Sequence, residues 1–371
     1  MGSYRPYIFF GSIPLALSFI LLFWVPPFEG SLLFVFLIIV NIFHRTCFTI
    51  VSVPYSSLTA RISDDSEERT KLTTARMLGA SFGTLSISAL GFPIINWFGS
   101  GEDSLGFVYL GICSGLAAIL ILAITVKTVK ERNFDIEFSK LPSFSEVSKS
   151  IVNNYAFLIV FASTLTLITT SIMFNKNLIY YTKYALGLHE FQGLILGVSS
   201  ASSFLAIPIW AYFALKIGKR NSWLISMSLL VFSFLFFYLY PIKNLIELLI
   251  VLIALGIGNG ATGVLFWSML PDTIEYGEWK TGVRTESSLY GFMTFAQKGG
   301  IAISALILGM LLTNIGFIPN TVQSEETLES LKSLMTFIPL AGVVLSFILV
   351  YFYPIDSKFH KKLIREINER S

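Results

Sequence analysis

Lys298 is the side chain whose place in the sequence most clearly demands a chemical role. It lies in an apolar run, Leu289–Ile315, and a position about ten residues inside that run is close to the centre of a bilayer at ~1.5 Å per residue. A charge at that depth costs at least ~3 kcal/mol. Lys298 is therefore expected to face a wet cavity or to form a structural ion pair with a carboxylate. Thr294, one turn earlier on the same face, offers a hydroxyl oxygen to a hard cation.

Arg45 is a second base placed deep in an apolar run, Leu32–Val53. It is too far from either end to serve only as a marker of membrane orientation, so it is expected either in a cavity or in a buried ion pair. The adjacent His44 is better explained as a hydrogen-bonded packing residue. Acidic side chains are missing from the deep part of every apolar run, since Glu247 stands near an edge. The sequence thus shows deep bases without evident acidic partners.

Composition identifies the class of protein that holds these bases. Of the 371 residues, 54% are hydrophobic and 13% are charged, against about 25% charged in soluble domains. This excludes soluble enzymes, nucleic-acid binders and disordered proteins, and it leaves a helical membrane protein. With no HExxH pattern and three histidines, an enzyme is not expected, and neither catalytic residues nor a resident metal is predicted. Cys47 and Cys113 lie in apolar runs and form no disulfide framework.

Ten apolar runs are long enough, at about 20 residues each, to cross a bilayer as helices. The predicted fold is therefore an all-α polytopic membrane protein with ten transmembrane helices. The runs are Tyr7–Val25, Leu32–Val53, Met77–Trp97, Leu105–Val126, Tyr155–Tyr180, Leu194–Leu215, Trp223–Tyr240, Leu245–Met269, Leu289–Ile315 and Leu334–Tyr353.

Lys and Arg are concentrated on one side of this arrangement. The connections on the other side hold only four of them, namely Lys176, Lys183, Lys243 and Lys332. By the positive-inside rule, both termini are expected in the cytoplasm and the chain in the cell (inner) membrane. The longest inside connection, 127–154, has mixed charge and predicts a boundary. It separates an incomplete four-helix bundle in 1–126 from a complete six-helix bundle in 155–371.

An internal repeat gives the layout of the bundles. Pro54 ends one run before a charged loop with Arg69, and Pro271 ends another before a charged loop with Arg284. The landmarks recur about 216 residues apart, which is six predicted helices. Parallel six-helix halves are the layout of the major facilitator fold. Helices three to twelve of such a fold are then expected here, without the first two. The alternative is a ten-helix transporter of another fold.

The loop after the eighth run carries a family resemblance. Residues 271–284 read PDTIEYGEWKTGVR and are followed by Glu286 and Tyr290. This stretch resembles the signature loop of the glycoside–pentoside–hexuronide:cation symporters, the melibiose-permease family within the major facilitator superfamily. Its first-half counterpart includes Pro54 and Arg69, and the resemblance extends over the whole chain. It implies sugar or glycoside transport driven by a co-transported cation, sodium or proton, with no other cofactor.

The resemblance also implies roles for particular residues. Lys298 and Arg76 match bases that line the family's sugar site, and Trp267 matches an indole that contacts the sugar. A guanidinium fork suits vicinal hydroxyls or a carboxylate. Plainer alternatives are a topological charge at Arg76 and an interfacial-belt residue at Trp267. The remaining candidates are Asn259, on the face of Trp267, and Arg45 for the substrate, with Thr294 and Ser52 for the cation.

Charged residues near the predicted inner mouth are candidates for a gate. Asp272, Glu275, Glu278 and Arg284 are expected to form ion pairs with the 56–76 loop when the inside is closed, through Arg69 or Arg61. Lys219 and Arg220 are expected to belong to the same latch.

The sequence departs from the family pattern in two respects. Ser52 and Ser56 stand where the melibiose permease has an acid and a Trp that contact sugar. The family's cation-binding carboxylates lie mainly in its first two helices. Because the deep bases would repel a cation, the 371 residues by themselves are expected not to couple sugar uptake to an ion. The alternative to a symporter is therefore a truncated, inactive remnant or an incompletely annotated member. The specific sugar and ion stay open.

Overall fold

The computed structural model describes residues 2–63, 65–99, 103–131, 143–319 and 321–370, and all regular elements in this part of the chain are helical. The chain divides into two compact units. Unit 1 is Met1–Asp65 with Gly79–Leu141, and unit 2 is Ser66–Leu78 with Pro142–Ser371. Helix α3 (Ser66–Gly99) therefore begins in unit 2 and continues in unit 1.

Unit 1 contains α1 (Arg5–Phe23), α2 (Gly30–Ile62), α4 (Asp103–Thr128) and the later turns of α3. Helix α1 packs on both α2 and α4. One cluster of buried apolar residues in this unit is formed by Ile8, Val51, Leu58 and Val126. Its apolar residues otherwise face outward over much of α1, α2 and α4, as expected of helices whose solvent is lipid.

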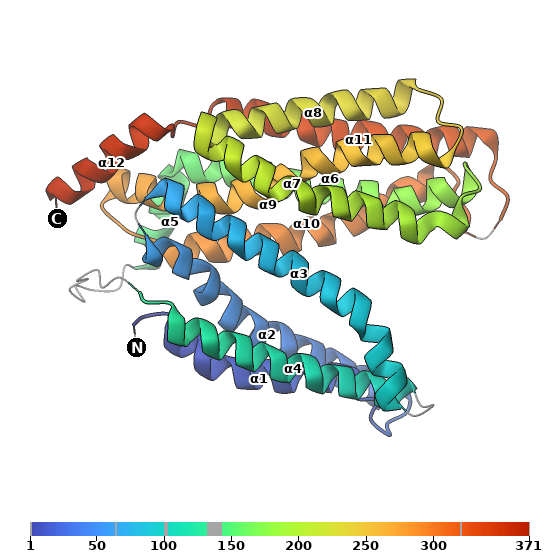
Figure 1. Cartoon of the computed structure of the whole chain (residues 1–371), viewed down its shortest axis with the longest axis horizontal. Coiled ribbons are helices and arrows are strands. Elements are labelled where there is room, and N and C mark those ends of the chain that lie inside the picture. Colours follow the sequence, from blue (N-terminus) through green and yellow to red (C-terminus); the bar gives the residue numbers. More distant parts are fainter. Residues whose placement is uncertain (1, 64, 100–102, 132–142, 320, 371) are drawn as a thin grey trace. The chain divides into compact units, whose positions relative to one another are not determined.

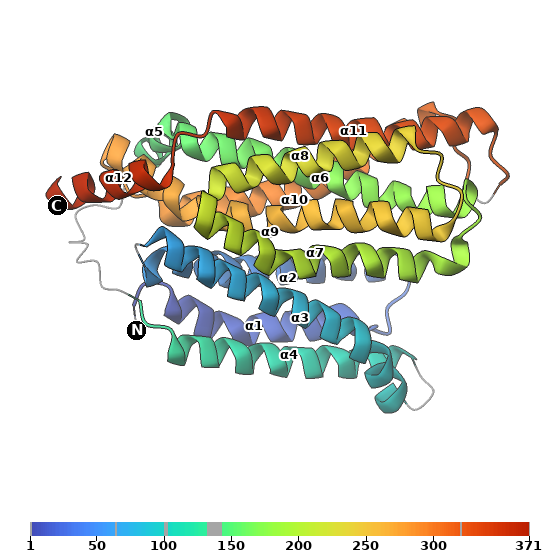
Figure 2. The same ribbon diagram turned by 45° about the horizontal axis from the view of Figure 1, so that its top comes forward.

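Unit 2 is a bundle of long helices with a short helix on either side of it in the sequence. Its elements are α5 (Phe144–Asn153), α6 (Tyr155–Tyr184), the single turn η1 (His189–Phe191), α7 (Gln192–Ile217), α8 (Lys219–Leu239), α9 (Leu245–Thr281), α10 (Glu286–Asn314), α11 (Glu325–Tyr351) and α12 (Ser357–Arg370). Helix α7 packs along α9, α6 along α11, and α8 against both α9 and α11. The short helices α5 and α12 lie at the same end of the bundle (Figures 1 and 2).

Close packing of α7 on α9 depends on two glycines. A Cβ atom on Gly256 would lie 2.8 Å from the Ser199 carbonyl oxygen, and one on Gly260 would lie 2.5 Å from the Ser203 carbonyl oxygen. Both contacts are with backbone, which cannot move aside cheaply. The small-xxx-small spacing lets the two helices approach, and this fixes the axis of α9, the helix that carries the site.

Nine described helices are long and apolar enough to cross a membrane. They coincide with nine of the ten expected runs. The tenth, Met77–Trp97, lies in α3, which is not among the nine, so the count of ten is not confirmed. Small and polar residues such as Ser81 and Thr84 make α3 less apolar than its neighbours. The predicted linker 127–154 includes α5, while its residues 132–142 lie outside the described part.

Candidate functional site

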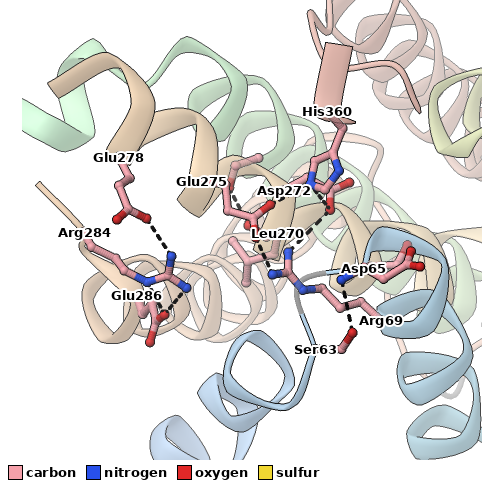
Figure 3. Close-up of polar contacts among 12 residues, drawn as sticks. Ser63, Asp65, Arg69, Leu270, Asp272, Glu275, Glu278, Arg284, Glu286 and His360 are labelled. Atoms are coloured by element: carbon pink, nitrogen blue, oxygen red, sulfur yellow. Dashed lines mark hydrogen bonds and ion pairs between the residues drawn. The ribbon is translucent and has the colours of Figure 1, made fainter. Parts of the chain in front are cut away.

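Five ionisable side chains meet around one end of α9 and form what we call the α9 charge cluster: Arg69, Lys219, Asp272, Glu275 and His360. All of them except the half-buried Lys219 are buried, and Figure 3 shows these four. Lys219 Nζ lies 2.7 Å from Asp272 Oδ2, and Arg69 donates to Glu275 Oε1. Arg69 Nη1 also lies 3.9 Å from Asp272 Oδ1. His360 Nε2 is 2.5 Å from Glu275 Oε2 and 3.7 Å from Asp272 Oδ1. Both carboxylates therefore have several cationic or hydrogen-bonding partners.

Four helices supply the α9 charge cluster. Asp272 and Glu275 lie three residues apart on α9, a spacing that puts both on one face. Arg69 comes from the start of α3, and Lys219 is the first residue of α8, where it also donates to the Ser268 carbonyl oxygen at 2.7 Å. His360 lies on α12. The cluster thus ties three other helices to α9.

Burial and neighbouring charges act in opposite directions on the pKa of Arg69 and of His360. Burial lowers the pKa of Arg69, but the adjacent Glu275 raises it by more, so the net pKa is raised and the guanidinium stays charged. Burial likewise lowers the pKa of His360, and the charge on Asp272 together with the bond to Glu275 raises it above the ordinary 6.5. Burial raises the pKa of Tyr353 well above its usual range, and the two carboxylates add to this effect. Tyr353 is thus a neutral phenol.

The charges of the α9 charge cluster favour an ion-pair network over a metal site. Asp272, Glu275 and His360 offer ligand atoms within 4.8 Å of one another, and these are atom types that bind metals. Arg69 and Lys219 already pair with the two carboxylates: Lys219 lies 2.7 Å from Asp272, and Arg69 contacts both Glu275 and Asp272. A metal ion would have to displace them, so the arrangement favours contact between helices.

Arg284 forms a second, local set of ion pairs in the connection between α9 and α10. Its Nη1 lies 2.6 Å from Glu278 Oε2, and its Nη2 lies 2.5 Å from Glu286 Oε1. Burial lowers the pKa of Arg284 and the two acids raise it by more, for a net rise. Glu278 and Arg284 were expected to reach the 56–76 loop, and the described contacts of Glu278 are instead with Arg284. Sequence proximity explains this, because Arg284 is only six residues from Glu278.

Replacing Arg284 with lysine is expected to destabilise the chain by about 1–2 kcal/mol, because one ammonium cannot reproduce two guanidinium bonds to two acids. Thermal unfolding in detergent measures this. The matched control is Arg365→Lys, whose pair with Glu369 is exposed, at 81% and 61% of the side-chain surface. An exposed pair contributes ~0–1 kcal/mol. Equal effects of the two substitutions would contradict the role assigned to Arg284.

An aromatic stack includes Trp267 of α9, which precedes Asp272 in that helix. The guanidinium carbon of Arg76 is 4.4 Å from the Trp267 ring centroid. Trp267 in turn stacks on Tyr290 of α10, with centroids 6.1 Å apart and planes 19° from parallel. Trp267 and Tyr290 are buried and Arg76 is half-buried. All three belong to unit 2. We call Arg76, Trp267 and Tyr290 the aromatic stack.

Polar candidates lie about two turns from the aromatic stack. Asn259 precedes Trp267 by eight residues on α9, and Lys298 follows Tyr290 by eight on α10, which is ~12 Å along each helix. Ser171 of α6 donates to Asn259 Oδ1 at 3.4 Å. Lys298 and Asn259 are both half-buried. Arg76 and Trp267 are therefore in contact, whereas Lys298 lies at a different depth, and the predicted cavity shared by all three stays a prediction.

Of the two hydroxyls expected to bind the cation, one has a described hydrogen bond and the other has none. Thr294 Oγ1 donates to the Tyr290 carbonyl oxygen at 2.9 Å, which leaves its lone pairs to accept or to ligate. Ser52 Oγ is buried, and no described hydrogen bond reaches it. Ser52 lies on α2 in unit 1 and Thr294 on α10 in unit 2.

Two other predicted bases have different surroundings. Arg45 is exposed on α2 and donates from Nε to Asn41 Oδ1 at 2.8 Å. Its exposure contradicts one of the two alternatives, the buried ion pair. Arg220 was expected in the latch with Lys219. It donates instead to the Tyr351 carbonyl oxygen and stands over that ring at 5.5 Å. Adjacent residues on α8 point about 100° apart, so only Lys219 faces α9.

His360 and Tyr290 were not among the predicted site residues. Tyr290 was noticed only as part of the loop that follows α9. For His360, one pattern was available: Phe359, Leu363 and Ile367 repeat at helical spacing in 357–370, which predicts an amphipathic helix whose apolar side must be covered. His360 adjoins that side.

Comparison with known proteins identifies the family of this chain. Residues 1–357 match the model of a family described as MFS/sugar transport protein. The chain is 26% identical over 373 residues to the glucuronide carrier protein homolog of Escherichia coli strain K12, covering all of this chain and 81% of the relative. It is 27% identical to the isoprimeverose transporter of Lactiplantibacillus pentosus, covering 77% of it. It is 26% identical to a putative sulfoquinovose importer of E. coli, covering 79% of it.

Solved structures agree on the fold. The E. coli fucose:proton symporter superposes with a TM-score of 0.68 at 15% identity, covering 95% of this chain and 85% of that one. A proton:xylose symporter superposes at 0.62 and 14% identity, covering 94% and 80%. At such low identity these likenesses establish only the major facilitator fold. Together with the family match over residues 1–357, they show that this chain belongs to the MFS/sugar transport protein family.

Proposed function

We propose that the chain is a symporter that carries a sugar or glycoside together with a cation, sodium or proton, by alternating access. The observation that carries this proposal is the aromatic stack. Arg76 stands 4.4 Å over the Trp267 ring, which stacks on Tyr290. An indole offers a face to sugar C–H groups, and the guanidinium beside it offers donors to sugar hydroxyls or to an anionic group.

The relatives support a sugar as the substrate, and several of them concern acidic sugars. Their names specify a glucuronide, isoprimeverose and sulfoquinovose. Arg76 suits a carboxylate or sulfonate through two parallel hydrogen bonds, and Lys298 adds a second positive charge on α10. We therefore propose a glycoside, pentoside or hexuronide as the substrate, and the experiment below compares an acidic with a neutral glycoside.

Two hydroxyls are separate candidates for binding the cation, Thr294 in unit 2 and Ser52 in unit 1. Hard cations take oxygen ligands, and these hydroxyls supply them without charge. The nearby bases would have to be neutralised for a cation to bind at these oxygens.

The α9 charge cluster is proposed as the gate at the cytoplasmic end, with both termini in the cytoplasm. The positive-inside pattern supports this orientation. Arg69 reaches Glu275 from a helix that continues into unit 1, so release of that pair is suited to a step in which access changes. Lys219 holds Asp272 within unit 2.

Uptake by the purified chain in proteoliposomes tests the proposed function. The probes are radiolabelled methyl β-glucuronide and methyl β-glucoside, a pair that differs in one carboxylate. Counterflow without an ion gradient is expected for at least one of them, and accumulation under an imposed sodium or proton gradient identifies the ion. Absence of counterflow for both, in vesicles where the chain is folded, would contradict transport of this class. Counterflow without accumulation under either gradient would contradict coupling alone.

A further inference from the structure

Helix α12 is docked on α9 by two groups of contacts. The first is aromatic and apolar: Phe359 meets Trp279 edge-on with centroids 5.8 Å apart, and Leu363 is 1% exposed. Trp279 Nε1 also donates to Glu366 Oε2 at 2.6 Å. The second is the bond from His360 to Glu275. Lys358, Lys361 and Arg365 lie exposed on the other side of α12.

The surroundings of His360 contain charges from every helix that meets it. From α9 come Asp272 at 3.7 Å and Glu275 at 2.5 Å from Nε2. Arg69 of α3 and Lys219 of α8 bind the same two carboxylates. The buried phenol of Tyr353, in the turn before α12, stands near both acids. The imidazole thus faces two anions directly and two cations through them.

We propose that α12 is a pH-sensitive latch, which stays docked on α9 while His360 is protonated and is released as His360 loses its proton. The geometry singles out His360 because it is the one residue of α12 whose charge changes near neutral pH and whose ring contacts α9 acids. Its Nε2 lies 2.5 Å from Glu275 Oε2, within hydrogen-bond reach, and a bond from a protonated imidazole to a carboxylate is charge-assisted. Loss of the proton removes this charge assistance.

The direction of the pH effect follows from linkage. Burial lowers the pKa of His360, and Asp272 and Glu275 raise it by more, so in the docked state it lies above 6.5. When α12 leaves, the imidazole regains an ordinary value. Well below pH 6.5, His360 is fully protonated in both the docked and the undocked state, and its stabilisation of docking is fully present. As pH rises through the docked-state pKa, that stabilisation is lost.

Hydrogen exchange of the backbone amides in Ser357–Arg370 tests the latch on the full chain in detergent. Mass spectrometry follows exchange from about pH 5.5 to about pH 9, the range that brackets histidine titration, with correction for the intrinsic rate. Protection of α12 is expected to fall with rising pH, by about tenfold for each unit that separates the docked and undocked pKa of His360. Protection of α6 is the internal reference for intact folding.

Three variants separate His360 from other titrating groups. His360→Gln keeps a donor for Glu275 and cannot titrate, so α12 protection should be lower and independent of pH. His360→Arg is always charged and should give high protection that is also independent of pH. His189→Gln removes an exposed histidine on η1 and should behave as the unmodified chain. Protection of α12 that is flat in the unmodified chain, or that still varies with pH in His360→Gln, overturns the proposal.

The latch is measured without a substrate, so its failure and failure of the proposed function are distinguishable. Its effect on transport rests on the proposed function. Because Glu275 binds both His360 and Arg69, release of α12 takes one partner from the acid that holds α3. Counterflow should then vary with pH in the unmodified chain and lose that dependence in His360→Gln and His360→Arg.

Discussion

Replacing Arg76 with alanine is expected to lower glycoside affinity by about 100-fold. Removing one partner of a hydrogen-bonded charge pair at a desolvated site costs ~2–5 kcal/mol, and each 1.4 kcal/mol is about tenfold. Arg76 is half-buried, so the lower part of that range applies. The measurement is equilibrium binding of whichever radiolabelled probe, methyl β-glucuronide or methyl β-glucoside, the unmodified chain transports.

Conservative variants show which property of the aromatic stack matters. Arg76→Lys keeps the charge and loses the fork, so it should recover only part of the affinity. Trp267→Phe keeps a ring for Arg76 and for the sugar, while Trp267→Ala removes it, so alanine should be the worse of the two. Exposed Arg365→Ala serves as the control for loss of an arginine. Unchanged binding in Arg76→Ala would contradict the assignment of the site to the aromatic stack.

Long apolar runs made most of the fold predictable. A segment that must satisfy its backbone within lipid can only be a helix, and nine such helices are described. The spacing of Asp272 and Glu275 also predicted one shared face, because helical geometry is local. The start of α5 is marked by its own sequence pattern. Ser143 and Glu146 form a capping box, with Ser143 N bonded to Glu146 Oε2 at 2.7 Å, and that pattern marks a helix start even in a charged segment.

Contacts between residues far apart in the sequence are the part of the site that the sequence predicts least well. Arg69 and Glu275 are 206 residues apart, and His360 and Glu275 are 85 apart. Opposite charges at a common end of the bundle made Arg69 a candidate partner for this acid, and that pair is present. Nothing in the order of residues distinguishes His360 from Lys361 as the one that turns toward α9. The docking face of α12 is decided by tertiary packing of Phe359 and Leu363.

Neutralising Glu275 alone is expected to destabilise the chain by about 3–5 kcal/mol, the cost of leaving a buried charge without its partner. In Glu275→Gln, the fully buried Arg69 loses its ion pair with Glu275 and keeps the contact with Asp272 at 3.9 Å. Arg69→Gln should cost a similar amount. The double variant leaves neither charge behind, so its cost should be less than the sum, with a coupling of about 1–3 kcal/mol. Thermal unfolding in detergent measures the stability of all three variants. Replacement of the exposed Glu369 of α12 by glutamine is the near-neutral control.

Transport by the same variants distinguishes a gating role of the Arg69–Glu275 pair from a purely structural role. If the Arg69–Glu275 pair only holds unit 2 together, counterflow should fall in proportion to stability in both single variants and in the double variant. A pair that has to break during each cycle opposes the step in which access changes. Arg69→Gln would then be less stable but would exchange its glycoside at least as fast as the unmodified chain. Parallel loss of stability and exchange would remove the gating role from the α9 charge cluster, while additive costs in the double variant would show that the two side chains are not energetically coupled.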